Sequence, residues 1–195
     1  MEDEWGAWEE ILARSGVALD RRRRTLCAEL NRHVRALAER VDPALDPALH
    51  YRDGLGDLEL PEEEEISARL ERLTRARGVD RKMGWTMHGP HRARLHCTIA
   101  SEELTDGASR GYSRLYSILL RLALAGVFEE RQSDPPVVLL DDPESELDPR
   151  WIGRLLTLIP ASSQVLVTAC RELSAMPARM RRMPIAEAVP AGSAA

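Results

Sequence analysis

Two adjacent carboxylates, Asp141 and Asp142, directly follow the apolar run Val137–Leu140. Four apolar residues in a row predict a buried, parallel strand, and ligand sites of α/β proteins lie beyond the carboxyl ends of such strands. In phosphoryl-transfer enzymes one such acid holds Mg²⁺ and the next orients the attacking water. We therefore expect Asp141 to be a metal ligand and Asp142 to be catalytic. The structural alternative is a strand that ends in an acidic turn.

A second candidate site lies at the start of the helix expected from about Ser109 to Phe128, which begins Ser109-Arg110-Gly111. The first turn of a helix has free backbone N–H groups and a positive dipole end, which together bind anions. The structural alternative is a serine that only caps the helix. A further polar segment, Ser145-Glu146-Leu147-Asp148, follows the paired acids, and Pro149 begins another expected helix.

The composition limits the chemistry that the chain can perform. Among its 195 residues are 27 basic side chains, of which Lys82 is the one lysine. A phosphate-binding P-loop requires G-x-x-x-x-G-K-[ST], but Met83 follows Lys82, so the sequence contains no P-loop. The net charge of −5 argues against a generally basic nucleic-acid-binding coat.

Cysteine spacing and hydropathy indicate the compartment. Cys27, Cys97 and Cys170 form no CxxC pair, which favours reduced thiols over a disulfide framework. No apolar stretch approaches the roughly 20 residues of a membrane span, and the acidic start lacks the apolar region of a signal peptide. We expect a cytoplasmic protein with no membrane partner.

Helical periodicity dominates the first part of the chain. Residues 5–41 read as a helix in two pieces, broken near Ser15-Gly16, with Asp20 capping the second piece. A short strand is expected near Leu49–Arg52. Another helix begins with Pro61 at its first position and ends at Gly78, and it could pair with the preceding helix as an antiparallel arm.

The pattern changes after Gly78. Alternation over Ala93–Ile99 predicts a half-buried strand, and the run Gln164–Thr168 predicts another. Together with the strand at Val137–Leu140 and the helix from Pro149, this strand–helix–strand order indicates the α/β class.

Two groups of arginines are candidate phosphate contacts. Arg21, Arg22, Arg23 and Arg24 form a basic run on the first helix, which could meet the DNA backbone. Arg92, in the turn Gly89-Pro90-His91-Arg92, could also contact a phosphate. The alternatives are a solvated helix face for the run and a purely structural turn for Arg92.

The order and spacing of these motifs resemble an ABC-type ATPase head, in which a signature motif precedes Walker B and a D-loop. Within that class the chain resembles the RecF family of DNA replication and repair ATPases, related to SMC-type heads. The matching strings are Gly89–Arg92, Ser109–Arg114, Leu139–Pro149 and Gln164–Thr168.

The resemblance implies the C-terminal half of such a protein, because the family carries its P-loop near the N-terminus. The implied fold is α/β: a partial ABC-type head lobe preceded by a helical arm. Residues 1–78 would form the arm segment, 79–186 the signature and Walker B lobe, and 187–195 a disordered tail.

The resemblance also implies roles for residues and partners. Ser109, Arg110, Gly111, Ser145 and Asp148 would contact ATP held by a second head, with Mg²⁺ at Asp141. The implied function is ATP-dependent binding of gapped or single-stranded DNA that supports recombinase loading and the SOS response. Partners would be DNA, a head-to-head dimer partner of RecF type and recombination mediator proteins.

Without a P-loop, the chain alone is expected to have little or no ATPase activity. One alternative is a non-enzymatic regulatory or relic module that pairs with a full-length head. Another is a reading frame upstream of Met1 that encodes the P-loop.

Overall fold

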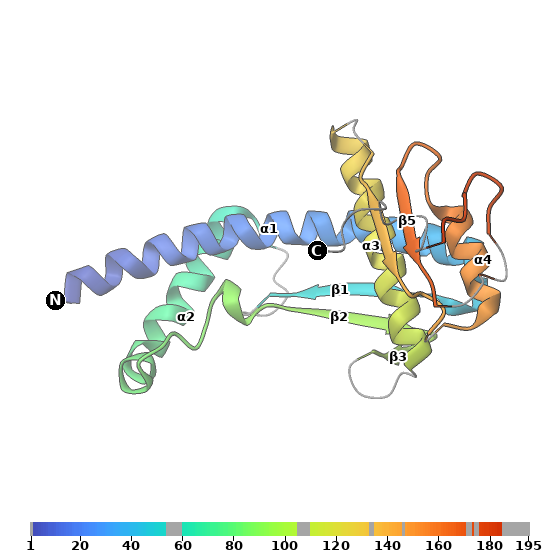
Figure 1. The fold of residues 1–195 in the computed structure, drawn as a ribbon. Coiled ribbons are helices and arrows are strands. Elements are labelled where there is room, and N and C mark those ends of the chain that lie inside the picture. Colours follow the sequence, from blue (N-terminus) through green and yellow to red (C-terminus); the bar gives the residue numbers. More distant parts are fainter. Residues whose placement is uncertain are drawn as a thin grey trace, which may run out of the picture.

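The computed structural model describes residues 2–53, 60–104, 110–132, 135–145, 147–170, 173 and 176–184. Its elements are α1 (Glu2–Val41), a 3₁₀ turn (Pro43–Leu45), β1 (Ala48–Arg52), α2 (Glu62–Met83), a second 3₁₀ turn (Pro90–Arg92), β2 (Arg94–Ile99), β3 (Glu102–Glu103), α3 (Arg110–Gln132), β4 (Val138–Asp141), α4 (Pro149–Leu158) and β5 (Val165–Thr168). The long helix α1 joins two parts of the molecule: its first half packs on α2, and its second half lies behind α3 and reaches α4 (Figure 1).

Helix α1 is continuous over 40 residues, so the expected break near Ser15-Gly16 is wrong. Gly16 instead marks a close approach to the neighbouring segments. A Cβ atom on Gly16 would lie 2.6 Å from Nη1 of Arg69 and 3.1 Å from Cγ of Pro90. The sequence predicts Asp20 as the cap of a second helix, but Asp20 lies in the middle of α1 and its side chain is buried. It forms an ion pair with Arg69, with 2.6 Å between Oδ2 of Asp20 and Nη1 of Arg69.

Replacing Gly16 with alanine should therefore lower stability. The added methyl group meets a buried guanidinium and a proline ring, and such overpacking costs about 1–3 kcal/mol, which the gain in helix propensity of about 1 kcal/mol offsets only in part. Gly6→Ala in the same helix is the matched control, because nothing lies within 4 Å of its Cβ position and alanine raises helix propensity by about 1 kcal/mol. Urea unfolding followed by circular dichroism measures both. Equal stabilisation by the two substitutions would contradict the close approach at Gly16.

Helix α2 runs further than the sequence predicts. It ends at Met83, and the residue that caps it is Gly84 at φ 77°, while Gly78 lies inside the helix. Pro61 is the N-cap residue rather than the first helical position. The expected antiparallel pairing with α1 is present: Arg77, near the end of α2, bonds to Glu9 near the start of α1, with 2.6 Å from Nη2 to Oε2.

A buried ionic cluster holds α1, α2 and the end of β1 together. We call it the elbow cluster, and its members are Asp20, Arg24, Asp53, Glu65 and Arg69. The side chains of Asp20, Asp53, Glu65 and Arg69 are all at most 2% exposed. The hydroxyl of Tyr51 donates to Asp20. Burial, together with that carboxylate, raises the pKa of Tyr51 to about 12.

The main hydrophobic core brings the second half of α1 together with α3 and α4. Val34, Ala38 and Val41 of α1 lie in the same buried cluster as Leu119 of α3 and Leu156 of α4. The guanidinium of Arg154 also donates to the carbonyl of Val41. Helix α1 thus contributes to both parts of the molecule. The division of the chain into an arm and a lobe at residue 78 stays a prediction.

The described strands form two sheets. Strands β1, β2 and β3 form an antiparallel sheet in that order, with Leu49 opposite Cys97. Strands β4 and β5 are parallel, with Asp141 opposite Thr168, and α4 lies between them in the chain. This strand–helix–strand unit confirms the expected α/β class.

The apolar run before the paired acids is covered on one face only, so the expected buried strand is wrong. Val138 and Leu140 pack against the main core. Val137 and Leu139 are 56% and 70% exposed, and Leu166 beside Leu139 is 51% exposed. The reason is that the described elements pack against a single face of the β4–β5 sheet.

Candidate functional site

The paired acids lie where β4 ends, beside the end of β5. Asp141 is the last residue of β4, and its partner in register is Thr168. The hydroxyl of Thr168 donates to Oδ1 of Asp141 at 2.5 Å and accepts from the amide of Asp142 at 3.1 Å. One threonine therefore holds the carboxylate of Asp141 and the backbone of Asp142. The sequence pattern places Thr168 in a strand and predicts no role for it, because this contact depends on the register between β4 and β5.

The backbone turns sharply at Asp142. Its φ of +40° is in the left-handed region, which residues other than glycine adopt at an energetic cost, often at functional sites. The carbonyl of Asp142 accepts from both the amide and the hydroxyl of Ser145, at 3.2 and 3.0 Å. This turn directs the chain back toward α4 and keeps Ser145 next to the paired acids.

The start of α3 is tied to the same strand end. Arg114, one turn into α3, donates from Nη2 to the carbonyl of Asp141 at 3.1 Å. Arg110 and Gly111 form the first turn of this helix, with Arg110 exposed and Gly111 half-buried. Ser109 lies outside the described residues. The structure thus links the expected anion-binding helix start to the expected metal-binding strand end through Arg114, for which the sequence pattern predicts no role.

Asp148 caps α4 and binds an arginine. Its Oδ1 accepts from the amide of Arg150 at 2.9 Å, and the Arg150 guanidinium bonds to both carboxylate oxygens, with 2.7 Å from Nη2 to Oδ2. These bonds hold the pKa of Asp148 below its usual range. The carboxylate is ionised and already engaged at the start of α4. A nucleotide contact from Asp148 stays a prediction.

An aromatic contact joins the first turns of α3 and α4. The rings of Tyr112 and Trp151 are 5.5 Å apart between centroids and are inclined at 43°. Such a pair contributes about 0.5–1.5 kcal/mol beyond the area it buries. Since Tyr112 directly follows Gly111, the contact helps to fix the helix start relative to the segment from Ser145 to Asp148.

The donors at the strand end suit Mg²⁺. This ion is commonly held by one or two carboxylates together with phosphate oxygens and water. Asp141 and Asp142 would offer carboxylate oxygens of this kind, and the Thr168 hydroxyl would offer a further oxygen. Among the described residues no group of three or more His, Cys, Asp or Glu side chains could hold a metal, so the nucleotide and water would have to complete the coordination.

The basic run of α1 is largely committed to internal contacts. Arg21 bonds to Glu65 at 3.1 Å, and Arg24 bonds to Asp53 at 2.7 Å and to Glu65 at 2.6 Å. Arg23 donates to the carbonyl of Pro90 at 2.9 Å.

Arg22 is the exposed member of that run. A DNA contact from Arg21–Arg24 stays a prediction, and it now depends mainly on Arg22.

The turn Gly89–Arg92 has a structural role. Gly89 adopts φ 146°, and Pro90–Arg92 form the 3₁₀ turn that leads into β2. A ring nitrogen of His91 lies 2.9 Å from the carbonyl of Thr86. Arg92 is half-buried and contacts Sδ of Met87 at 3.7 Å. A phosphate contact from Arg92 stays a prediction.

Comparison with known proteins identifies the relatives of this chain. It is 36% identical over 170 residues to the DNA replication and repair protein RecF of Herpetosiphon aurantiacus, a match that covers 86% of the chain and 43% of the relative. The corresponding protein of Thioalkalivibrio sulfidiphilus is 35% identical over 164 residues, covering 84% of the chain and 43% of the relative. No protein-family model matches the chain.

Solved structures agree in fold. The recombination mediator protein RecF with ATPrS, in the RecFOR pathway, superposes with a TM-score of 0.74 at 24% identity, covering 88% of this chain and 46% of that one. RecF with ATP superposes with a TM-score of 0.73 at 26% identity, covering 87% and 45%. None of the described helices is long and apolar enough to cross a membrane. The chain spans less than half the length of the relatives it matches, and it is a RecF-family sequence that corresponds to their C-terminal half.

Proposed function

We propose that this chain supplies the signature and Walker B part of a RecF-type ATPase head that acts in DNA replication and repair. The observation that carries the proposal is the pair of acids at the end of a parallel strand, where Thr168 bonds to the carboxylate of Asp141 and to the backbone amide of Asp142. The contact of Arg114 with the carbonyl of Asp141 supports it, because the contact ties an anion-binding helix start to the same strand end.

Each group at the strand end has a separate task in this proposal. Asp141 and the Thr168 hydroxyl hold the Mg²⁺ that accompanies the nucleotide, and Asp142 orients the attacking water. Bound Mg²⁺ would neutralise charge on the transferred phosphoryl group. The free amides at Arg110 and Gly111, with Ser109 before them, bind phosphate oxygens of ATP held by a second head. Ser145 and Asp148 belong to the same face of that dimer.

The biological role follows the relatives. They are named as DNA replication and repair proteins, and the RecF structures are described as a recombination mediator of the RecFOR pathway with ATP or ATPrS. We propose ATP-dependent binding to gapped or single-stranded DNA in the cytoplasm, in support of recombinase loading and the SOS response, with recombination mediators as partners.

The proposal is tested by comparing the chain alone with the reconstituted head. Because the sequence has no P-loop, equilibrium dialysis of the chain alone should give no saturable ATP binding. Co-purified with the N-terminal part of the Herpetosiphon RecF protein, it should bind a fluorescent gapped duplex at least tenfold more tightly with ATP than without it. Each part alone is the control. Micromolar ATP binding by the chain alone, or equal DNA affinity with and without ATP, would contradict the proposal.

A further inference from the structure

The first half of α1 has an exposed stripe on the face opposite α2. Figure 1 shows this part of the helix reaching away from the two sheets, with α2 beside it. The inner face, with Ala13 and Val17, is buried against α2. The residues of the outer stripe are alternately four and three positions apart, which places them along one side of the helix. We call them the arm stripe, and all six are exposed: Glu4, Trp8, Ile11, Ser15, Ala18 and Arg22.

Large apolar side chains occupy the middle of the arm stripe. Trp8 is 69% exposed and Ile11 is 54% exposed. The ring of Trp5, on the flank of the stripe, is already engaged, because the guanidinium of Arg81 lies 5.0 Å from its centroid. Exposed apolar residues that repeat at spacings of four and three residues are typical of a helix face that packs on a second helix. The arm stripe therefore favours a helix as its partner.

The charges of the arm stripe indicate which helix that is. The stripe begins with Glu4 and ends with Arg22, and each lies nine positions from Ala13. If two copies of α1 lie antiparallel and are centred on Ala13, Glu4 of each copy is opposite Arg22 of the other. In a parallel pair each charge would face its own counterpart, and like charges that face each other are unfavourable. Charge complementarity therefore selects an antiparallel pair of identical helices.

The sizes of the side chains agree with the same alignment. Trp8 of one copy would lie opposite Ala18 of the other, since both are five positions from the centre. Ile11 would lie opposite Ser15 in the same way. Large residues opposite small ones allow two helix faces to interdigitate. Each contact occurs twice in such a pair, as a two-fold symmetric interface requires.

Arg14 lies on the flank of the arm stripe near its centre, where two copies would bring their arginines close together. Nε of Arg14 is 3.1 Å from Oε1 of Glu10, and Nη1 is 3.9 Å from Oε2 of Glu63. Each guanidinium therefore has carboxylates of its own chain beside it. These carboxylates offset the repulsion between the two copies of Arg14.

We propose that the arm stripe binds the arm stripe of a second copy of this chain as an antiparallel helix pair. The stripe spans about 27 Å of helix, at 1.5 Å per residue, so the interface is small and the association is weak. The contact lies on α1, whereas the paired acids lie at the end of β4. It goes beyond the proposed function, because it joins two copies without nucleotide.

The test is sedimentation velocity of the full chain, without nucleotide or DNA, over a concentration series that reaches several hundred micromolar. The original chain should show a monomer–dimer equilibrium. Trp8→Ala should raise the dissociation constant at least about tenfold, because a large aromatic side chain at an interface carries much of its affinity. Trp85→Ala is the matched control. Trp85 is 56% exposed but follows α2, outside the arm stripe, so its variant should associate like the original chain.

A charge reversal tests the antiparallel alignment. Glu4→Arg or Arg22→Glu alone should raise the dissociation constant at least about tenfold, because like charges then meet at both ends. The double variant should restore the original value, and so should an equimolar mixture of the two single variants, in which each arginine meets a glutamate. Glu39→Arg is the control for a charge reversal on α1 outside the stripe. Its dissociation constant should match that of the original chain.

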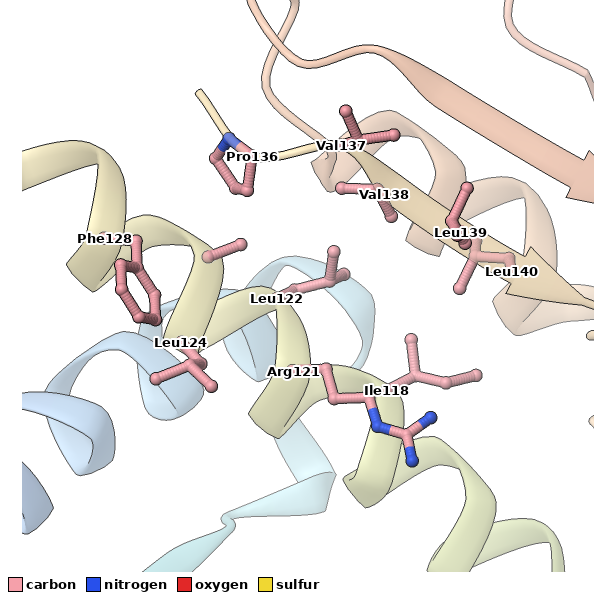
Figure 2. A pocket seen from close by; sticks show the side chains of 11 residues that line it. Ile118, Arg121, Leu122, Leu124, Phe128, Pro136, Val137, Val138, Leu139 and Leu140 are labelled. Carbon is pink, nitrogen blue, oxygen red and sulfur yellow. The ribbon is translucent and has the colours of Figure 1, made fainter. Parts of the chain in front are cut away.

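A second apolar surface serves as a further control. It is the groove of about 260 Å³ between α3 and β4, which Leu139 lines (Figure 2). Leu139→Glu should dimerise like the original chain, and loss of the dimer in this variant would place the contact at the groove and overturn the proposal.

Three other results would also overturn it. They are a chain that stays monomeric throughout the series, association of Trp8→Ala equal to that of the original chain, and a double variant that does not recover. A monomeric chain that binds a labelled single-stranded oligonucleotide, and loses this binding in Trp8→Ala, would make nucleic acid the occupant instead. Circular dichroism of each variant should match the original chain, which excludes misfolding as the cause of a lost dimer.

Discussion

Arg69→Met should lower the free energy of unfolding by about 3–5 kcal/mol, the cost of removing one partner from a buried ion pair. The Arg69 side chain is 2% exposed and lies between Asp20 and Glu65, which are equally buried. Methionine fills a similar volume without charge. The loss of stability therefore comes from carboxylates that have lost their cation and not from a cavity. Urea unfolding followed by circular dichroism gives the magnitude.

Arg75→Met is the matched control for the elbow cluster. Arg75 lies on the same helix, but it pairs with Glu71 on an exposed surface, with side chains 77% and 62% exposed. Exposed pairs at this spacing contribute about 0.3–0.5 kcal/mol. If the two substitutions lower the free energy of unfolding equally, the elbow cluster does not stabilise the packing of α2 on α1. Hydrogen exchange should also show faster exchange along α2 in Arg69→Met.

Asp141→Ala should reduce Mg²⁺-dependent ATP hydrolysis by the reconstituted head at least 100-fold, a loss typical of removing one preorganised electrostatic group from an active site. The measurement is phosphate release at saturating ATP. The substitution removes both the proposed metal ligand and the acceptor of the Thr168 hydroxyl. Glu144→Ala is the control, because Glu144 is a carboxylate in the same turn without a proposed role, and its variant should stay within about twofold. Unchanged hydrolysis by Asp141→Ala would remove Asp141 from the site.

Thr168→Val separates positioning from metal binding in the same assay. The variant keeps both carboxylates but loses the hydroxyl that bonds to the carboxylate of Asp141 and to the backbone amide of Asp142. Thr168→Val should lower the rate of ATP hydrolysis less than Asp141→Ala does. The difference from the original chain should become smaller as the Mg²⁺ concentration rises. A purely structural defect would not respond to Mg²⁺.

Local patterns were sufficient to predict the strand end that carries the paired acids. Four apolar residues before Asp141 predict β4, and the parallel pairing of β4 with β5 agrees with the expected class. The positions of glycines were less informative. The sequence pattern predicts a helix end at Gly16, which instead allows a close contact, and a cap at Gly78, although the chain turns at Gly84. A glycine in the sequence can indicate a helix end or a close contact with another segment, and only the tertiary packing decides between the two.

Long-range contacts account for the features that local sequence patterns do not predict. Arg21 and Arg24 read as a basic surface in the sequence, but Asp53 and Glu65 neutralise them from positions 29 to 44 residues away. The role of Thr168 depends on how two strands align. The apolar run at β4 does not reveal that one face of the strand is exposed to solvent. An apolar sequence indicates which residues favour burial, but not whether another segment packs on them.

The unbroken length of α1 has a mechanical consequence. Its end near Val41 is fixed to α4 by Arg154, while its start is clamped to α2 through Glu9. With a rise of 1.5 Å per residue, its 40 residues form a rod about 60 Å long. A tilt of only about 5° at the end beside α3 and α4 would displace the other end by about 5 Å for a rod of this length. A small rearrangement around the paired acids would therefore reach α2 as a movement larger than a hydrogen bond, and α1 would act as a lever between the two.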